Sequence, residues 1–241
     1  MSDQAGTAGR QSSGGGSRRR RSRWEGRYQK KQGTEFCWYL DEPPPELISL
    51  VQGDGFPSGG ALDLGCGPGV ATAYLAKFFS PSIGLDIAHA AVVQAKDLAA
   101  RQGVAPSFVV AEAPVLPFRS GRFALVFDRG CLQAIPKEAW PTYFREVERL
   151  LEPGGVLQLF CSKPMKRFPS LLSYRGVRAR ARWMLGRRGP QFLSHDLLHR
   201  LAEPGLAVQE LRDFPFQPKV GPLRAMTYGV FTKRADGPSP S

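Results

Sequence analysis

Long hydrophobic runs and closely spaced cysteines are both missing from this sequence of 241 residues. No apolar run approaches the roughly 18 residues that a membrane-spanning helix needs, and no apolar stretch typical of a signal peptide stands near the start. The four cysteines are far apart and form no C-x-x-C pair: Cys37, Cys66, Cys131 and Cys161. We therefore expect a cytoplasmic protein with reduced thiols, rather than a membrane-spanning, disulfide-bonded or zinc-binding one.

Acidic residues are nearly absent from two segments, which together account for the net charge of +12. Residues 1–23 carry a net charge of +5 and residues 163–190 carry +9, whereas the rest of the chain is close to neutral. The Gly/Ser-rich and then Arg-rich composition of residues 1–23 predicts a disordered basic tail. The run Arg18–Arg21 has three open interpretations: a solvated stretch, a nuclear localisation signal or an anion-binding arm. A mitochondrial transit peptide is a further alternative for this tail.

The predicted folded domain covers residues 24–241 and begins with an aromatic segment at residues 24–55. Trp24, Tyr28 and Trp38 belong to this segment, which ends in a run of prolines and a predicted short helix at about 45–52. A dense aromatic cluster on an otherwise polar stretch is either a packed cap or one wall of a pocket. In the second case these three side chains would contact a substrate.

Apolar runs and helical patterns alternate through the rest of the chain. Strands are predicted at about 60–65, 82–87, 106–112, 122–128 and 155–161, with helices at about 69–79, 88–102 and 137–151. This spacing indicates βαβ units and therefore an α/β fold with a mostly parallel sheet that helices cover on both faces. Two late strands, 205–214 and 223–234, follow a helix that begins near Ser194 and are expected to form an antiparallel pair at the sheet edge.

The stretch "LDLGCGPGV" (62–70) points to a ligand site. Gly65, Gly67 and Gly69 follow the first strand and open the first helix, where bare backbone can approach a ligand. The G-x-G-x-G spacing differs from the dinucleotide fingerprint, because Val70 stands where that pattern needs its third glycine. No G-K-[ST] follows, which excludes a phosphate-binding P-loop.

Two carboxylates at the ends of the next strands extend this site. Asp86 ends the second strand, seventeen residues after Gly69, where a carboxylate can accept hydrogen bonds from both hydroxyls of a ribose. Glu112 and Ala113 end the third strand, where a side chain and a backbone amide can read the edge of an adenine. The glycines and both acids, in this order, predict a nucleoside-binding crevice.

With these residues the chain resembles the class I, seven-stranded S-adenosylmethionine-dependent methyltransferases of type 11/25. The similarity rests on "ALDLGCGPGVATAYLA", "IGLDIAHAAVVQAK", "VVAEAPVLPF", "RFALVFDRGCLQAI" and "RLLEPGGVLQLF", over about residues 60–162. The resemblance implies a Rossmann-like, doubly wound fold, S-adenosylmethionine as cofactor, and a role for Asp63 at the methionine amine. It also implies that Cys66 and Ile87 line the cofactor crevice. The family's usual Ser or Thr cap two residues after the ribose acid is Ala88 here.

Acceptor residues are expected at the carboxyl ends of the fourth and fifth strands. Asp128 is the leading candidate to orient or deprotonate an acceptor and to border the cofactor, and the alternative is a carboxylate bonded to its own loop or to Arg129. Arg129 and Gln133 are expected to contact the substrate. Cys131 has no evident partner base and is interpreted as a buried small hydrophobe. His195 and His199 lie four residues apart, a spacing that lets two side chains share a metal on one helical face. Because the sequence offers no third ligand for them, we expect no metal site.

The predicted activity is methyl transfer to a sulfur, oxygen or nitrogen atom of a small molecule. The "D-x-G-C-L" sequence and the aromatic segment resemble the thiol, thiopurine and tellurite branch, whereas the aromatic segment also resembles some protein-lysine methyltransferases. A catalytically silent relative that binds the cofactor or a partner is the third hypothesis. The basic insertion at 163–190 has helical periodicity and is a solvated surface helix, a lid over the pocket, or a contact to a membrane or nucleic acid.

Overall fold

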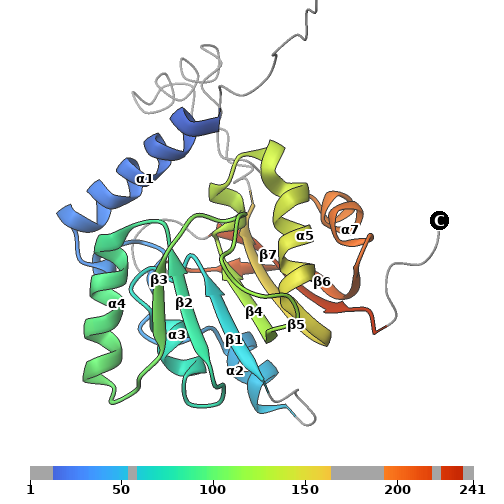
Figure 1. Cartoon of the computed structure of the whole chain (residues 1–241), viewed down its shortest axis with the longest axis horizontal. Coiled ribbons are helices and arrows are strands. Elements are labelled where there is room, and N and C mark those ends of the chain that lie inside the picture. The colour runs from blue at the N-terminus through green and yellow to red at the C-terminus, as the bar shows by residue number, and fades with distance from the viewer. Residues whose placement is uncertain (1–12, 54–58, 164–192, 219–223, 236–241) are drawn as a thin grey trace, which may run out of the picture.

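Seven strands form one twisted sheet with helices on both faces (Figure 1). The computed structural model describes residues 13–53, 59–163, 193–218 and 224–235 of the chain. The strands are β1 Gly60–Leu64, β2 Ser82–Asp86, β3 Ser107–Val110, β4 Phe123–Arg129, β5 Leu151–Ser162, β6 Leu206–Phe216 and β7 Arg224–Lys233. The helices of four or more residues are α1 Ser13–Lys30, α2 Pro45–Gln52, α3 Val70–Leu75, α4 His89–Arg101, α5 Trp140–Leu150 and α7 His195–Ala202.

The strand order is β3-β2-β1-β4-β5-β7-β6. The first five of these strands pair in parallel, whereas β7 runs antiparallel to both β5 and β6. The expected Rossmann-like α/β fold with an antiparallel edge pair is therefore confirmed. Every residue of β1 and β2 is buried, which explains their continuous apolar runs: helices cover both faces of these central strands.

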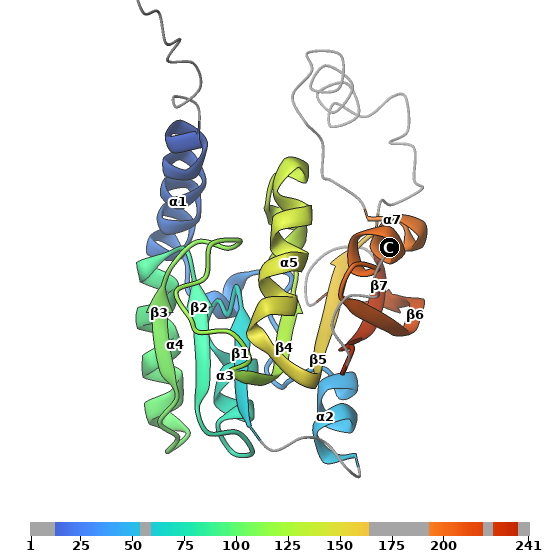
Figure 2. The ribbon, with the colours of Figure 1, turned by 45° about the vertical axis from the view of Figure 1, so that its right-hand side comes forward.

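Helices α2 and α3 cover one face of the sheet and α5 and α7 cover the other (Figure 2). Along α5 the buried side chains recur at helical spacing, from Trp140 through Tyr143, Phe144 and Val147 to Leu150. This stripe fixes the face that α5 turns to the sheet. Ser194 accepts a hydrogen bond from the Leu197 amide at 3.2 Å, so the predicted start of α7 is confirmed.

Helix α1 is a correction to the disorder predicted for residues 1–23, since residues 13–23 are helical. Arginine favours helix, and α1 gains contacts that its own composition does not reveal, through Arg20 and Glu25. The helix rises above the amino-terminal end of α4, beyond the carboxyl ends of the parallel strands (Figures 1 and 2). Residues 1–12 and 164–192, which include almost all of the predicted basic insertion, lie outside the described residues.

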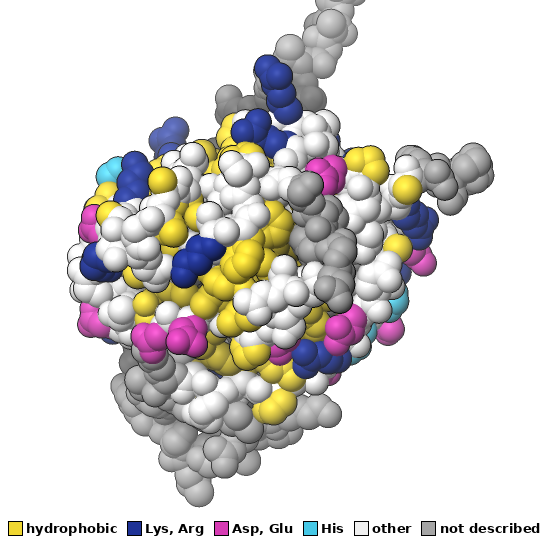
Figure 3. Space-filling view, turned by 90° about the horizontal axis from the view of Figure 1, so that it is seen from below, with side chains coloured by type: hydrophobic (Ala, Val, Ile, Leu, Met, Phe, Trp, Pro, Cys, Tyr) yellow, Lys and Arg dark blue, Asp and Glu magenta, His cyan; other side chains and the backbone are white. Residues whose placement is uncertain are grey.

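The opposite edge, where the parallel strands begin, carries charges of both signs around a central group of hydrophobic side chains (Figure 3). Phe78, which follows α3, is half exposed. No helix in the part of the chain that the structure describes is long and apolar enough to cross a membrane.

Candidate active site

A cavity of about 590 Å³ opens at the carboxyl ends of the strands, a size typical of small-molecule sites. Its lining comes from α1, from the aromatic segment, from the loops after β1 to β4, and from the ends of β5, β6 and β7. The cavity has two chemically different ends. Carboxylates, bare backbone and side chains of α1 gather toward β1, β2 and β3, whereas Phe127, Phe216 and Met226 gather with Arg129 and Arg224 toward β4 and the antiparallel strands.

Asp86 joins the glycine loop to the start of α4. Its Oδ2 accepts a hydrogen bond from the Gly67 amide at 3.0 Å, and its Oδ1 accepts one from the Ala88 amide at 2.9 Å. Burial raises the pKa of Asp86 to about 6, although these backbone donors lower it. Each oxygen retains acceptor capacity toward the cavity, which fits the expected bonds to two ribose hydroxyls. Ile87 lines the cavity beside it.

Gly67 presents bare backbone because no side chain fits there. Its φ is +52°, and a Cβ atom would lie 2.9 Å from the Tyr28 hydroxyl. Gly65 and Cys66 also line the cavity, as expected. Gly69 is a correction, since it is absent from the lining: its φ is +83° and its missing Cβ makes room for Ala95 of α4. Gly69 therefore lets α3 and α4 pack closely.

Asp63 lines the cavity from the end of β1. The Thr72 hydroxyl donates to its Oδ2 at 2.6 Å, which fixes the orientation of the carboxylate. Burial raises the pKa of Asp63 to about 7, and the nearby carboxylates of Asp128 and Asp86 contribute to the increase. A cationic ligand group at this position would stabilise the ionised form, in line with the role that the resemblance implies for Asp63.

Glu112 lines the cavity at the end of β3, but its carboxylate is bonded to α1. Arg20 Nε donates to Glu112 Oε1 at 2.9 Å, and the Ser17 hydroxyl donates to Oε2. The side chain expected to read an adenine edge therefore holds α1 over this end of the cavity. Ala113 lines the cavity next to it.

Asp128 is a second correction, because it does not line the cavity and is fully buried beneath it. Its Oδ1 accepts from the Cys131 amide at 2.7 Å, and its Oδ2 accepts from the Leu132 amide at 2.9 Å and the Tyr143 hydroxyl at 2.6 Å. Asp128 thus fixes the loop after β4, in agreement with the alternative that its carboxylate is bonded to its own loop. Cys131 lines the cavity and is half-buried, not buried as expected, and desolvation raises the pKa of its thiol above the ordinary value.

Aromatic side chains form one wall of the cavity, and this wall reaches the glycine loop through Tyr28. Trp24, Tyr28 and Trp38 all line it, and Phe36 packs behind them, stacked on Trp38 with ring centroids 4.6 Å apart. Both interpretations of the aromatic segment therefore apply, since the cluster is packed and also borders the cavity. The Arg27 guanidinium lies over the Trp24 ring at 4.8 Å.

Arg129 and Gln133 line the cavity beyond β4, in the positions expected for substrate contacts. Gln133 Oε1 accepts from the Ser162 amide, which ties this loop to the end of β5. Sequence reasoning missed Arg20, Phe216, Arg224 and Met226, which also line the cavity. No local motif marks them, because they come from the predicted tail and from the edge strands.

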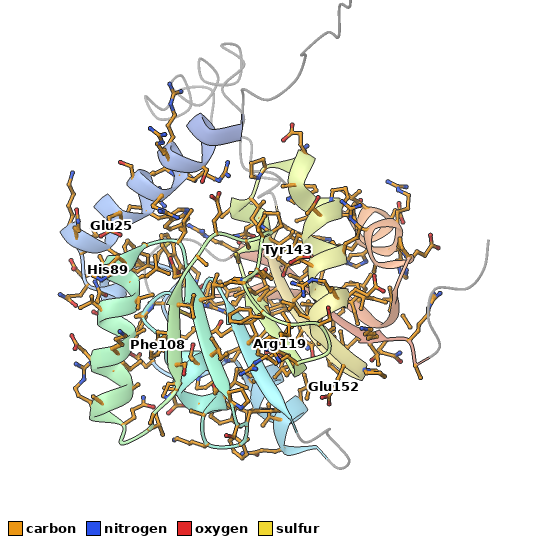
Figure 4. The ribbon with its side chains drawn as sticks, viewed as in Figure 1. Glu25, His89, Phe108, Arg119, Tyr143 and Glu152 are labelled. Carbon is orange, nitrogen blue, oxygen red and sulfur yellow. The ribbon has the colours of Figure 1, made fainter. Side chains whose placement is uncertain are left out.

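Helix α4 lacks its own capping side chain, and α1 provides one. Both Glu25 carboxylate oxygens lie 3.3 Å from the Ala90 amide in the first turn of α4. Figure 4 shows Glu25 of α1 next to His89, the first residue of α4.

His195 Nε2 lies 2.9 Å from Asp213 Oδ1. Among the described residues, no three His, Cys, Asp or Glu side chains form a potential metal site.

A family model for a methyltransferase domain matches residues 61–155. This central part of the chain therefore resembles a methyltransferase domain. The family resemblance seen in the sequence is thereby confirmed. The match spans β1 to the first part of β5, and so includes Asp63, Gly67 and Asp86 of the cavity.

Curated relatives of this chain include methyltransferases named for small molecules. They include the 2-heptyl-1-hydroxyquinolin-4(1H)-one methyltransferase of Mycobacteroides abscessus, 32% identical over 49% of this chain and 52% of the relative. The chloroplastic tocopherol O-methyltransferase of Arabidopsis thaliana is 38% identical over 55% of this chain and 36% of the relative. Thiocyanate methyltransferase 1 of the same plant is 30% identical over 52% of this chain and 59% of the relative. The matched regions thus span about one third to three fifths of these relatives.

Many solved structures share the fold of this chain. One, solved in work on the conversion of a disulfide bond into a thioacetal group during echinomycin biosynthesis, has a TM-score of 0.68 and 22% identity over 90% of this chain and 94% of the other. Another, an S-adenosylmethionine-dependent methyltransferase of Methanosarcina mazei, has a TM-score of 0.62 and 18% identity over 81% of this chain and all of the other. At these identities the likeness is one of fold.

Proposed function

We propose that this protein transfers a methyl group from S-adenosylmethionine to an oxygen or sulfur atom of a small molecule. The observation that carries the proposal is the two-ended cavity: Asp63, Gly67 and Asp86 at one end, and an aromatic and apolar chamber at the other. The small-molecule oxygen and sulfur acceptors of the curated relatives support the choice of acceptor.

The residues at the first end fit the proposed cofactor. The missing Cβ of Gly67 lets the Tyr28 hydroxyl approach the backbone, and Asp86 keeps acceptor capacity for a ribose. Asp63 is a buried carboxylate suited to a cationic amine. When bound, S-adenosylmethionine supplies an electrophilic methyl group on a sulfonium, so this chain mainly has to hold the two reactants in line. Positioning of this kind contributes up to about 7–11 kcal/mol in favourable cases.

The side chains of this chain carry out that positioning. Thr72 and the Gly67 amide fix the two carboxylates, while Trp24, Tyr28 and Trp38 exclude water from one side of the cavity. Asp128 is bonded to its loop and to Tyr143, and therefore does not act as a base on an acceptor.

The proposal is tested in two steps. Isothermal titration with S-adenosylhomocysteine should show binding, and no binding at millimolar concentration would refute the proposal. Incubation with cofactor labelled in its methyl group, a metabolite extract and a protein lysate should then label compounds in the organic phase. Label in protein bands alone would favour a protein-lysine methyltransferase, and binding without any label would favour a catalytically silent relative.

A further inference from the structure

Arg129 is placed to meet the acceptor. It is the last residue of β4, and its side chain lines the cavity. Its Nη1 donates to the Trp38 carbonyl oxygen at 2.9 Å, and its guanidinium lies 5.4 Å from the centre of the Phe216 ring, at the end of β6. Because β5 and β7 stand between β4 and β6 in the sheet, this contact shows that the Arg129 side chain extends toward the antiparallel strands.

The surroundings of Arg129 are apolar. Phe127, Phe216 and Met226 line the same part of the cavity, together with Trp38. No carboxylate among residues 13–53, 59–163, 193–218 and 224–235 forms an ion pair with Arg129, although Asp63 and Glu46 lie near enough to raise its pKa. Burial outweighs them and lowers the pKa of Arg129 to about 10. A cation held in this way gains from an anion that enters the cavity.

We propose that Arg129 binds the acceptor as an anion, so that the protein selects apolar molecules carrying an ionised oxygen or sulfur, such as a phenolate or thiolate. The inference rests on the proposed methyl transfer and names its acceptor class. Arg224, which lines the same end and donates to Cys37 Sγ at 3.7 Å, adds a second positive charge near the anion.

This arrangement explains why no general base is needed at the acceptor. The acceptor gives its proton to solvent on binding, and Arg129 stabilises the anion that remains. The anionic oxygen or sulfur then forms a bond to the methyl carbon with one of its electron pairs. The bond between that carbon and the sulfonium sulfur breaks, and its electron pair stays on the sulfur. The products are a neutral methyl ether or thioether and S-adenosylhomocysteine, whose sulfur is an uncharged thioether. No proton moves in this step.

The cofactor itself offers a second anion, the carboxylate of its amino-acid end. This carboxylate is a direct competitor, because Arg129 lies near enough to Asp63, at the proposed amino-acid end of the cofactor, for the two charges to interact. The contact of Arg129 with Phe216 favours the acceptor, because β6 lies at the opposite edge of the sheet from β3. An experiment has to separate these two anions. S-adenosylhomocysteine and 5′-methylthioadenosine make the comparison, since the second compound lacks the amino-acid carboxylate.

The acceptor arm uses 4-nitrophenol, whose absorbance reports its ionisation, and 4-nitroanisole, its methylated and neutral counterpart. With S-adenosylhomocysteine present, the wild-type protein should bind 4-nitrophenolate about 10- to 100-fold more tightly than 4-nitroanisole, the range of a hydrogen bond to a charged group. The pKa of bound 4-nitrophenol, followed by its absorbance, should also be lower than the pKa of 4-nitrophenol in solution. Arg129→Met should abolish both effects, and Arg129→Lys should retain part of them.

Arg145→Met is the matched control, because Arg145 is exposed on α5 and bonds only Thr142 among the described residues. It should leave both effects unchanged. An equal affinity of the wild type for the two nitro compounds, or a preference that survives in Arg129→Met, would overturn the inference. So would an Arg129→Met protein that binds S-adenosylhomocysteine no better than 5′-methylthioadenosine, since Arg129 would then hold the cofactor. Failure of the wild type to bind S-adenosylhomocysteine would instead refute the proposed function.

Discussion

Arg20 and Glu112 form an ion pair between α1 and the end of β3, although 92 positions separate them in the sequence. Five residues after Arg20, Glu25 accepts a hydrogen bond from the Ala90 amide and so ties α1 to the start of α4. These two attachments hold α1 beside the cavity, where Trp24 and Tyr28 of the same helix complete its wall. The position of the wall therefore depends on the attachment of α1.

Arg20→Ala should detach this helix more often. Loss of about 1 kcal/mol, the upper end for an ion pair near the surface, raises the population of detached helix about fivefold. Trypsin should therefore cleave within α1 about five times faster, as measured by the disappearance of the intact chain. Arg18→Ala removes an exposed arginine and a trypsin site without touching Glu112, so it serves as the control. Equal cleavage rates for the two variants would contradict the role assigned to the ion pair.

Tyr143→Phe and Asp128→Asn should act on stability rather than on turnover. Tyr143 is fully buried and its hydroxyl donates to Asp128, and a hydrogen bond to a charged group contributes about 1.5–3 kcal/mol. We expect Tyr143→Phe to lower the free energy of unfolding by this amount in urea titrations, with kcat within about twofold of the wild type. Asp128→Asn should also be destabilised. An Asp128→Asn protein with wild-type stability and a hundredfold lower kcat would show that Asp128 is catalytic after all.

The cofactor-free protein should become less stable as the pH rises. Burial raises the pKa of Asp63 to about 7 and those of Asp86 and Asp128 to about 6, whereas an unfolded Asp titrates near 3.9. From about pH 4 to pH 7 the folded chain thus binds more protons than the unfolded chain, so the free energy of unfolding falls as pH rises. Thermal denaturation should show Tm several degrees lower at about pH 8 than at about pH 5.

The variant Asp63→Asn should flatten this pH dependence, because the amide stays neutral at every pH. Asp97→Asn, an exposed position on α4, should leave it as in the wild type. A Tm of the cofactor-free protein that rises between about pH 5 and pH 8 would show that these carboxylates are not destabilised by burial.

Most of the sheet was predictable because the central strands are buried on both faces and read as apolar runs. Asp86 was placed correctly at the cavity for the same reason, since it ends such a run. Asp128 and Arg129 show the limit: neighbours in a strand point to opposite faces, and the sequence alone does not say which face borders the cavity. The structure directs Arg129 to the cavity and Asp128 to Tyr143.

Helix α1 and the acceptor chamber depend on contacts between distant segments. Composition favours disorder around Ser13 and Gly16, and only the partner Glu112 reveals why Arg20 is ordered. Phe216 and Met226 reach the cavity through the pairing of β6 with β7, which places them beside Arg129. No local pattern in the sequence contains that register.

Asp86→Ala should weaken the binding of S-adenosylhomocysteine by about 1–3 kcal/mol, because the ribose hydroxyls lose a charged acceptor and the Gly67 amide loses its anchor. Isothermal titration measures this as a rise in Kd of about 5- to 150-fold. Asp97→Ala removes an acid from the exposed face of α4 and should leave the Kd unchanged. Circular dichroism would verify that both variants are folded at the titration temperature. A folded Asp86→Ala protein with the wild-type Kd would mean that the ribose is held elsewhere, and the orientation proposed for the cofactor would have to be abandoned.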